Sequence, residues 1–110
     1  ENPVIFYKEG TWARPLKNEI WEIGCDVRYW LLAGQLAYIE LSEKIDMLMA
    51  GEPFGKILSS TGQTETLISP MTGRVKEINI NANTAMSALI RDNLSEGWLL
   101  WLARIQPITI

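Results

Sequence analysis

The sequence predicts a mostly β domain, a sandwich or flattened barrel that also carries two short helices. Apolar segments are short, and roughly seven or eight of them have the length and composition of strands. Clusters of Gly, Pro, Asn and Ser separate them, as tight turns between strands require. Hydrophobic residues make up 47% of the chain and include five tryptophans, enough for a core. The 110 residues have the size of one domain, and we expect residues 1–110 to form a single domain.

Composition excludes several classes of function. The chain contains no histidine, which rules out His-based acid–base catalysis and most zinc sites. The single cysteine, Cys25, cannot form an intrachain disulfide and suits a reducing, cytoplasmic location. The net charge is −3 and no basic stripe is visible, so we expect no nucleic-acid binding. No apolar run approaches the roughly 20 residues of a membrane span and no signal peptide is recognisable, so we expect no membrane association.

The first part of the chain predicts three strands. Val4–Tyr7 is an apolar run preceded by a proline, which is typical of an edge strand, and Trp12–Arg14 can pair with it as a hairpin. Ile20–Cys25 alternates between two faces, with Trp21, Ile23 and Cys25 on one and Glu22 and Gly24 on the other. We therefore expect a half-buried strand, in which Cys25 is a small core residue rather than a reactive thiol.

A short helix is expected next, because Asp26 can accept hydrogen bonds from the free amides of a first helical turn. The helix should cover Val27–Ala33 and end at Gly34, and its apolar block Tyr29–Leu32 should pack against the sheet. Leu36–Leu41 is nearly continuously apolar, which predicts a strand covered on both faces.

The middle of the chain leads into a further strand. Met47–Met49 should fill the core, because methionine adapts to irregular gaps. Ala50–Pro53 has the composition of a turn, and the apolar segment Phe54–Leu58 that follows predicts a strand.

The most informative stretch is Ser59–Thr64, which contains only small, polar or hydroxyl-bearing residues around one glycine. Apolar residues resume at Leu67–Ile68, so the pattern predicts a β-hairpin whose glycine can take a positive φ. Pro70 and Gly73 then predict a second turn, with proline at its entry and glycine at its exit.

The last part of the chain predicts a strand, a helix and a central strand. Arg74–Ile80 is rich in strand-forming residues but alternates imperfectly, and Asn81–Asn83 has the composition of a turn. Thr84–Arg91 should be a short helix capped by its first residue. Trp98–Leu102 is the most apolar stretch and should be a central strand or an interface that ends by Pro107.

Several segments, in a fixed order and spacing, resemble the glycine cleavage system H protein family. They are Tyr7–Trp12, Ile23–Asp26, Gln35–Leu41, Ala50–Ile57, Ser69–Val75, Ile78–Asn79 and Ser95–Leu99. The family has a histidine where this chain has Gly10. Together the segments span nearly the whole chain, and the resemblance implies the lipoyl/biotinyl-type fold, a barrel-sandwich hybrid.

The resemblance also implies a function. Members of the family carry lipoate on a lysine at the hairpin tip, receive an aminomethyl group on that arm and pass it between enzymes, so they are carriers rather than catalysts. Counting back from Pro70 or from Asn79 places the family's lysine at Gly62, and Ser59 stands where the family has an acidic residue. The nearest lysines, Lys56 and Lys76, fall in the flanking strands.

Two functions follow from this comparison. The first is an H-protein-like domain without lipoate or any other cofactor, which binds a protein partner such as a glycine-cleavage or lipoate-related enzyme. Its docking surface would be the tip residues Ser60, Thr61, Gly62 and Gln63, or the aromatic segments Tyr29–Leu32 and Trp98–Trp101. The second is a lipoyl carrier of the glycine cleavage system that uses Lys56 or Lys76 as a displaced attachment site.

An enzyme is the third and least favoured hypothesis. Acidic pairs such as Glu40 with Glu43, or Asp92 with Glu96, have the composition needed for acid–base work but read as solvated loop charges. Cys25 would lack a histidine to activate it. We therefore expect no catalytic residue and no metal ligand in this chain.

Overall fold

The computed structural model describes residues 3–33, 36–42, 45–92 and 99–108. Within these ranges the elements are β1 (Phe6–Lys8), β2 (Thr11–Pro15), β3 (Trp21–Asp26), α1 (Val27–Ala33), β4 (Leu36–Leu41), β5 (Met47–Leu48), β6 (Pro53–Ser59), β7 (Thr64–Ile68), β8 (Gly73–Ile78), α2 (Ala82–Asp92) and β9 (Leu99–Pro107). The mostly β class with two short helices is therefore confirmed.

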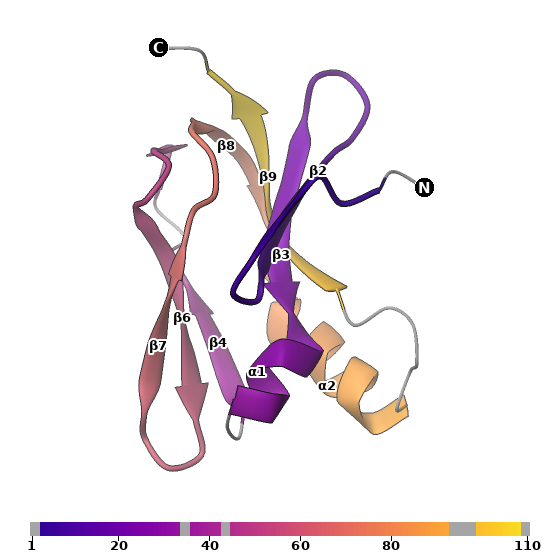
Figure 1. Ribbon diagram of the computed structural model, residues 1–110, viewed down its shortest axis with the longest axis vertical. Coiled ribbons are helices and arrows are strands. Elements are labelled where there is room, and N and C mark those ends of the chain that lie inside the picture. The colour runs from indigo at the N-terminus through magenta and orange to yellow at the C-terminus, as the bar shows by residue number, and fades with distance from the viewer. Residues whose placement is uncertain (1–2, 34–35, 43–44, 93–98, 109–110) are drawn as a thin grey trace.

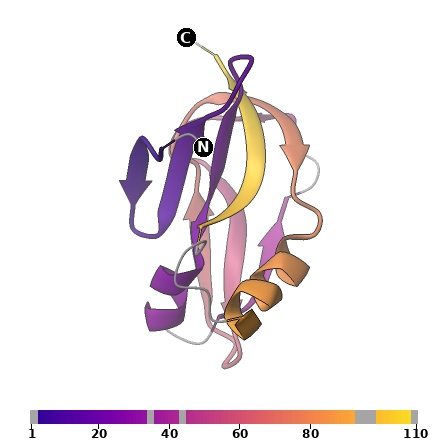
Figure 2. The same cartoon turned by 90° about the vertical axis from the view of Figure 1, so that its right-hand side faces the viewer.

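Two antiparallel sheets form the fold. The larger has the strand order β1-β2-β3-β9-β8-β5, and the smaller has the order β4-β6-β7. They lie side by side with both helices near one end (Figure 1). In the view turned by 90°, the strands curl around a common interior, as expected of a barrel-sandwich hybrid (Figure 2).

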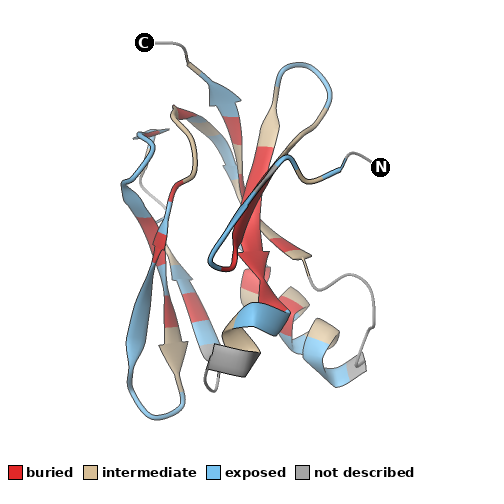
Figure 3. Ribbon diagram, in the orientation of Figure 1, coloured by how far each residue is buried: buried red, intermediate tan, exposed pale blue. Residues whose placement is uncertain are grey.

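The core lies between the sheets and is centred on β9. Leu102, Ala103 and Ile105 are fully buried on this strand, and buried segments of β3 and β6 face the same interior (Figure 3). The prediction of a central strand at this place is confirmed for Leu99–Leu102, while Trp98 lies outside the described residues.

Helix α1 confirms the predicted cap and the predicted bounds. The Asp26 carboxylate accepts hydrogen bonds from the backbone amides of Arg28 (3.0 Å) and Tyr29 (3.3 Å). These are first-turn amides with no partner inside the helix, so the carboxylate stabilises the helix start. The predicted end at Gly34 lies outside the described residues.

The prediction that β3 is only half buried is wrong. Glu22 keeps just 2% of its surface exposed, because its carboxylate bonds Arg14 on β2 (2.8 Å) and Arg104 on β9 (3.0 Å). Gly24, on the same face, lies against the Leu100 backbone and the Trp12 ring, where a Cβ atom would have no room. The second face of β3 is thus covered by long-range contacts, which strand periodicity cannot reveal.

Two further burial predictions are also wrong. β4 is covered on one face only: Ile39 is buried, whereas Tyr38 on the opposite face is 51% exposed. Met47 and Met49 are 43% and 49% exposed and do not fill the core, which instead receives Leu48 between them. In each segment, side chains are buried or exposed according to which face of the strand they occupy, because only one face is covered. Apolar character alone does not predict their burial.

The structure explains or corrects three local details around β8. The chain bends at Pro70 and Met71, and Gly73 follows as the first residue of β8, where close packing requires glycine because a Cβ atom would collide with Ile105 and the Gln106 carbonyl. The register shifts between Val75 and Glu77, and this bulge explains the imperfect alternation. Helix α2 begins at Ala82, inside the predicted turn, so Thr84 is not its cap.

Cys25 is fully buried, which confirms that it is a core residue, and burial raises the pKa of its thiol to about 12. In the unfolded chain the thiol titrates at about pH 8.5. The free energy of unfolding should therefore lose a Cys25-dependent part as the pH rises from about 9 toward 12, by up to roughly 1.4 kcal/mol per pH unit.

Urea unfolding of the wild type and of Cys25→Ala across this pH range tests the prediction. The difference in the free energy of unfolding between the two proteins should shrink with rising pH, because only the wild type carries the thiol. Parallel pH profiles would contradict the assigned pKa.

Candidate functional site

The hairpin between β6 and β7 presents the site that the sequence predicts. Its tip, residues Ser60, Thr61, Gly62 and Gln63, joins strands paired from Leu58–Thr64 to Pro53–Ile68. The four residues are exposed and lie at the end of the molecule where the helices lie (Figures 1 and 3). The structure thus brings the predicted tip residues together in one tight connection.

Ser59 organises this tip. Its Oγ accepts hydrogen bonds from the backbone amides of Thr61 (3.3 Å) and Gln63 (3.1 Å) and also bonds the Thr61 hydroxyl (2.8 Å). Its backbone carbonyl accepts a hydrogen bond from the Gly62 amide (3.1 Å), and its backbone amide donates to the Gln63 carbonyl (2.9 Å). Ser59 therefore bonds three of the four tip residues and holds the turn in shape.

Gly62 completes the turn with φ +90°, a conformation that L side chains rarely adopt. No heavy atom lies within 4 Å of the position that a Cβ atom would occupy. A side chain at this position would therefore meet open solvent, and its cost would come from the backbone conformation alone.

The two lysines proposed as displaced attachment sites do not lie at the tip. Lys56 lies within β6, between Glu40 on β4 and Thr66 on β7, and its side chain is exposed. Lys76 is exposed at the bulge of β8, in the other sheet. Both therefore project from sheet faces, where neither is presented by a tight turn.

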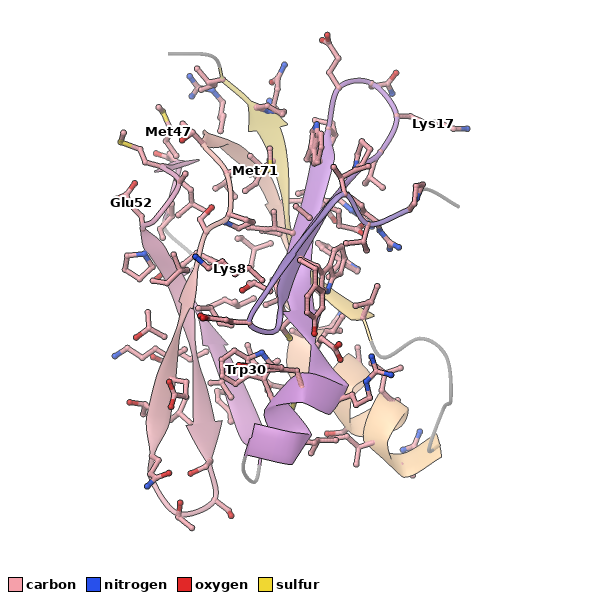
Figure 4. The ribbon with its side chains drawn as sticks, in the orientation of Figure 1. Lys8, Lys17, Trp30, Met47, Glu52 and Met71 are labelled. Atoms are coloured by element: carbon pink, nitrogen blue, oxygen red, sulfur yellow. The ribbon has the colours of Figure 1, made fainter. Side chains whose placement is uncertain are left out.

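A cleft of about 480 Å³ lies beside the hairpin, between the β1–β2 turn, α1 and β7; we call it the β7 cleft. Its walls include Lys8 and Glu9, Tyr29 and Trp30, and Glu65 and Thr66. Figure 4 shows the Lys8 side chain extending toward β7 and the Trp30 side chain below it. Sequence patterns do not predict this cleft, because its walls come from three segments far apart in the chain.

Gly10 holds the wall of the β7 cleft near α1. Gly10 has φ +84°, and its carbonyl accepts hydrogen bonds from the Trp30 indole (3.2 Å) and from the Asp26 amide (2.8 Å). A Cβ atom here would collide with the Tyr29 ring and lie 2.8 Å from the Trp30 Nε1 atom. The two aromatic rings occupy the space that a larger residue would need.

A partly buried polar contact links β1 to Asp26, the residue that precedes α1. The Tyr7 hydroxyl donates a hydrogen bond to Asp26 (2.8 Å), and burial followed by this bond raises the pKa of Tyr7 to about 12. The contact ties β1 to the start of α1, so the β1–β2 turn and α1 are held together on one side of the β7 cleft.

The described residues bring together no cluster of side chains of the kind that binds a metal ion. No three His, Cys, Asp or Glu side chains gather within these ranges. Of the acidic pairs, Glu40 is exposed beside Lys56, whereas Glu43 and Glu96 lie outside the described residues, as does the side chain of Asp92. In the part of the chain that the structure describes, no helix has the length and apolar character to cross a membrane.

Comparisons with known proteins agree with this architecture. The sequence model of the family described as Glycine cleavage H-protein matches residues 4–108. The glycine cleavage system H protein of Rubrobacter xylanophilus is 30% identical over 97 residues, covering 88% of this chain and 75% of that protein. The H protein of Xylella fastidiosa is 30% identical over 102 residues, covering 93% of this chain and 77% of that protein.

A solved structure supports the fold independently. The crystal structure of a glycine cleavage system H protein from Mycobacterium marinum superposes with a TM-score of 0.72 and covers all of this chain and 87% of that one. At 21% sequence identity this likeness concerns the fold alone.

The hydrogen bonds of Ser59 generate a prediction for the tip. Ser59→Ala should lower the free energy of unfolding by about 1 kcal/mol, because the Thr61 and Gln63 amides lose their acceptor. Ser59→Asp should retain most of the stability, since a carboxylate can accept the same bonds. Urea unfolding measures both variants, and equal losses in the two would show that Ser59 Oγ does not organise the turn.

Proposed function

The chain belongs to the glycine cleavage H-protein family, and from this premise we propose that it is a non-catalytic, protein-binding member whose hairpin tip carries no lipoyl group. One observation carries the proposal: the hairpin tip holds Gly62 at the position where counting back from Pro70 or from Asn79 leads us to expect the family's lipoyl-bearing lysine. The sequence contains no lysine between Lys56 and Lys76, so the whole tip lacks an amine to acylate.

The geometry of the tip supports the proposal. With φ +90°, position 62 favours glycine over lysine, so the residue suits the turn rather than the attachment of an arm. The bonds from Ser59 hold the turn in one shape without a cofactor. A preordered loop loses less conformational entropy on docking, which favours a role in binding.

The partner we propose is a protein that recognises this hairpin, such as a glycine-cleavage or lipoate-related enzyme. Ser60, Thr61, Gly62 and Gln63 would form the contact surface, because they are exposed and hold donors and acceptors at a fixed spacing. The chain would act in the cytoplasm without a cofactor and without catalysing a reaction. Cys25, the strongest nucleophile by residue type, is fully buried and therefore suits no catalytic role.

The alternative function is a lipoyl carrier with a displaced lysine. The match to the family over residues 4–108 favours it, because carriers are the family's usual members. Lys56 and Lys76 are both exposed, so each has room for an acyl group. Their place on sheet faces opposes it, because a ligase would have to reach an amine that no turn presents.

Intact-mass measurement decides between the two functions. After co-expression with a lipoate ligase and free lipoate, the wild-type chain should keep its unmodified mass. Gly62→Lys should gain one lipoyl group and serves as the control for a working ligase. A wild-type mass raised by one lipoyl group, and lost in Lys56→Arg or Lys76→Arg, would overturn the proposal in favour of the carrier.

Gly62→Lys also tests the role of the glycine in folding. Because position 62 has a positive φ, the substitution should lower the free energy of unfolding by about 1 kcal/mol through backbone strain. Gly62→Asn should cost less, since asparagine tolerates this conformation better than lysine. Thermal melts give the comparison, and equal melting temperatures for wild type and Gly62→Lys would show that the turn relaxes freely.

A further inference from the structure

The four sheet edges of the described chain differ in how well they are protected. β1 and β5 are short, with three and two residues. On β4, the Asn83 side chain donates to the Ile39 carbonyl (2.8 Å) and accepts from the Ile39 amide (2.7 Å), so it occupies the place of a neighbouring strand. β7 has five residues and contains no proline, and its pairing with β6 is regular from Thr64 to Leu67, with a register shift only between Leu67 and Ile68. Among these edges β7 is therefore the open one.

The hydrogen-bond pattern shows which groups of β7 point outward. The Ser59 amide donates to the Gln63 carbonyl, and bonded pairs alternate along an antiparallel ladder. Ile57–Glu65 is then the next bonded pair, so the amides and carbonyls of Thr64 and Thr66 point away from β6. Neither residue forms a backbone hydrogen bond to another described residue outside the β6 ladder.

The outward edge of β7 opens into the β7 cleft, whose size fits a single extended segment. Strands lie roughly 4.8 Å apart, sheets roughly 10 Å apart, and each residue advances roughly 3.4 Å, so one added residue fills about 160 Å³. A cleft of about 480 Å³ therefore accommodates about three residues of one strand. A second copy would offer the edge of its own β7, Thr64–Ile68, which contains no basic residue to face Glu65.

Charge indicates the chemistry of that segment. Glu65 pairs with Ile57 and shares the inward face of the sheet with Leu67, so a strand added next to β7 would place one side chain beside Glu65 and another beside Leu67. Glu65 takes part in none of the ion pairs between described residues, and the cleft is lined by two carboxylates, Glu9 and Glu65, against one cation, Lys8. A basic side chain beside Glu65 and an apolar one two residues away match these neighbours.

We propose that an extended segment of a partner protein, with a basic and an apolar residue two positions apart, adds to β7 as an antiparallel fourth strand of the smaller sheet. The added backbone bonds Thr64 and Thr66, its basic side chain faces Glu65, and its apolar side chain faces Leu67 and the aromatic wall. This mode of recognition uses backbone hydrogen bonds for affinity and alternate side chains for selection. It is independent of whether the hairpin tip carries a lipoyl group.

The experiment uses the full chain and a synthetic, end-blocked peptide of alternating threonine and valine with one central lysine. Binding is followed by shifts of the assigned backbone amide signals during an NMR titration. Thr66→Pro removes the outward amide, and an outward-facing edge position tolerates proline. This variant should bind the peptide about tenfold more weakly, whereas Thr66→Val, which keeps the amide, should bind like the wild type.

Two further measurements keep the proposal falsifiable. A peptide with glutamate in place of lysine should bind roughly threefold more weakly to the wild type, and Glu65→Gln should reduce that preference. If Thr66→Pro fails to fold, a peptide N-methylated at the amides that face β7 replaces it and should not bind. Equal binding by Thr66→Pro or by the methylated peptide overturns the proposal, as does a wild-type dimer in sedimentation that the Thr66→Pro substitution abolishes.

Discussion

A buried carboxylate holds the larger sheet together. Glu22 on β3 bonds Arg14 on β2 and Arg104 on β9, and Arg104 extends the chain of charges to Glu77 on β8 (2.9 Å). The ion pairs thus link four neighbouring strands in the order β2-β3-β9-β8. Because a buried charge without its partner costs several kcal/mol, this network favours a single arrangement of the sheet. Arg14 also lies over the Trp12 ring and Arg104 over the Trp101 ring, so cation–π contacts add to the network.

This rigid sheet positions the parts that carry function. Its β1–β2 turn and the helix that follows β3 form one wall of the β7 cleft, and the smaller sheet forms the other. The hairpin extends from the smaller sheet. This sheet packs against the larger sheet through the shared core, so the hairpin tip has a fixed position. The arrangement suits the protein-binding role proposed above, because the tip and the cleft are both held in place by the sheets.

Local signals in the sequence predicted the elements that depend on neighbouring residues. The Asp26 cap, the bounds Val27–Ala33 and the hairpin around Gly62 each need only a few adjacent positions. Burial of Glu22 was missed because its partners are 8 and 82 residues away. The β7 cleft was missed for the same reason, since its walls meet only after the sheets have formed. The start of α2 was misplaced because the Asn79 side chain, which accepts from the Asn81 amide (3.1 Å), precedes the predicted cap.

Asn83 has a wider consequence. Asn83 belongs to α2, yet its side-chain amide bonds the backbone of Ile39 on β4. The β4 edge is therefore protected from pairing with another molecule only while α2 stays docked. Any event that detaches α2, such as heating or cleavage of the chain, would expose a second row of unsatisfied peptide groups. The tendency of the protein to aggregate through β4 therefore depends on the docking of α2, and the side chain of Asn83 makes that link.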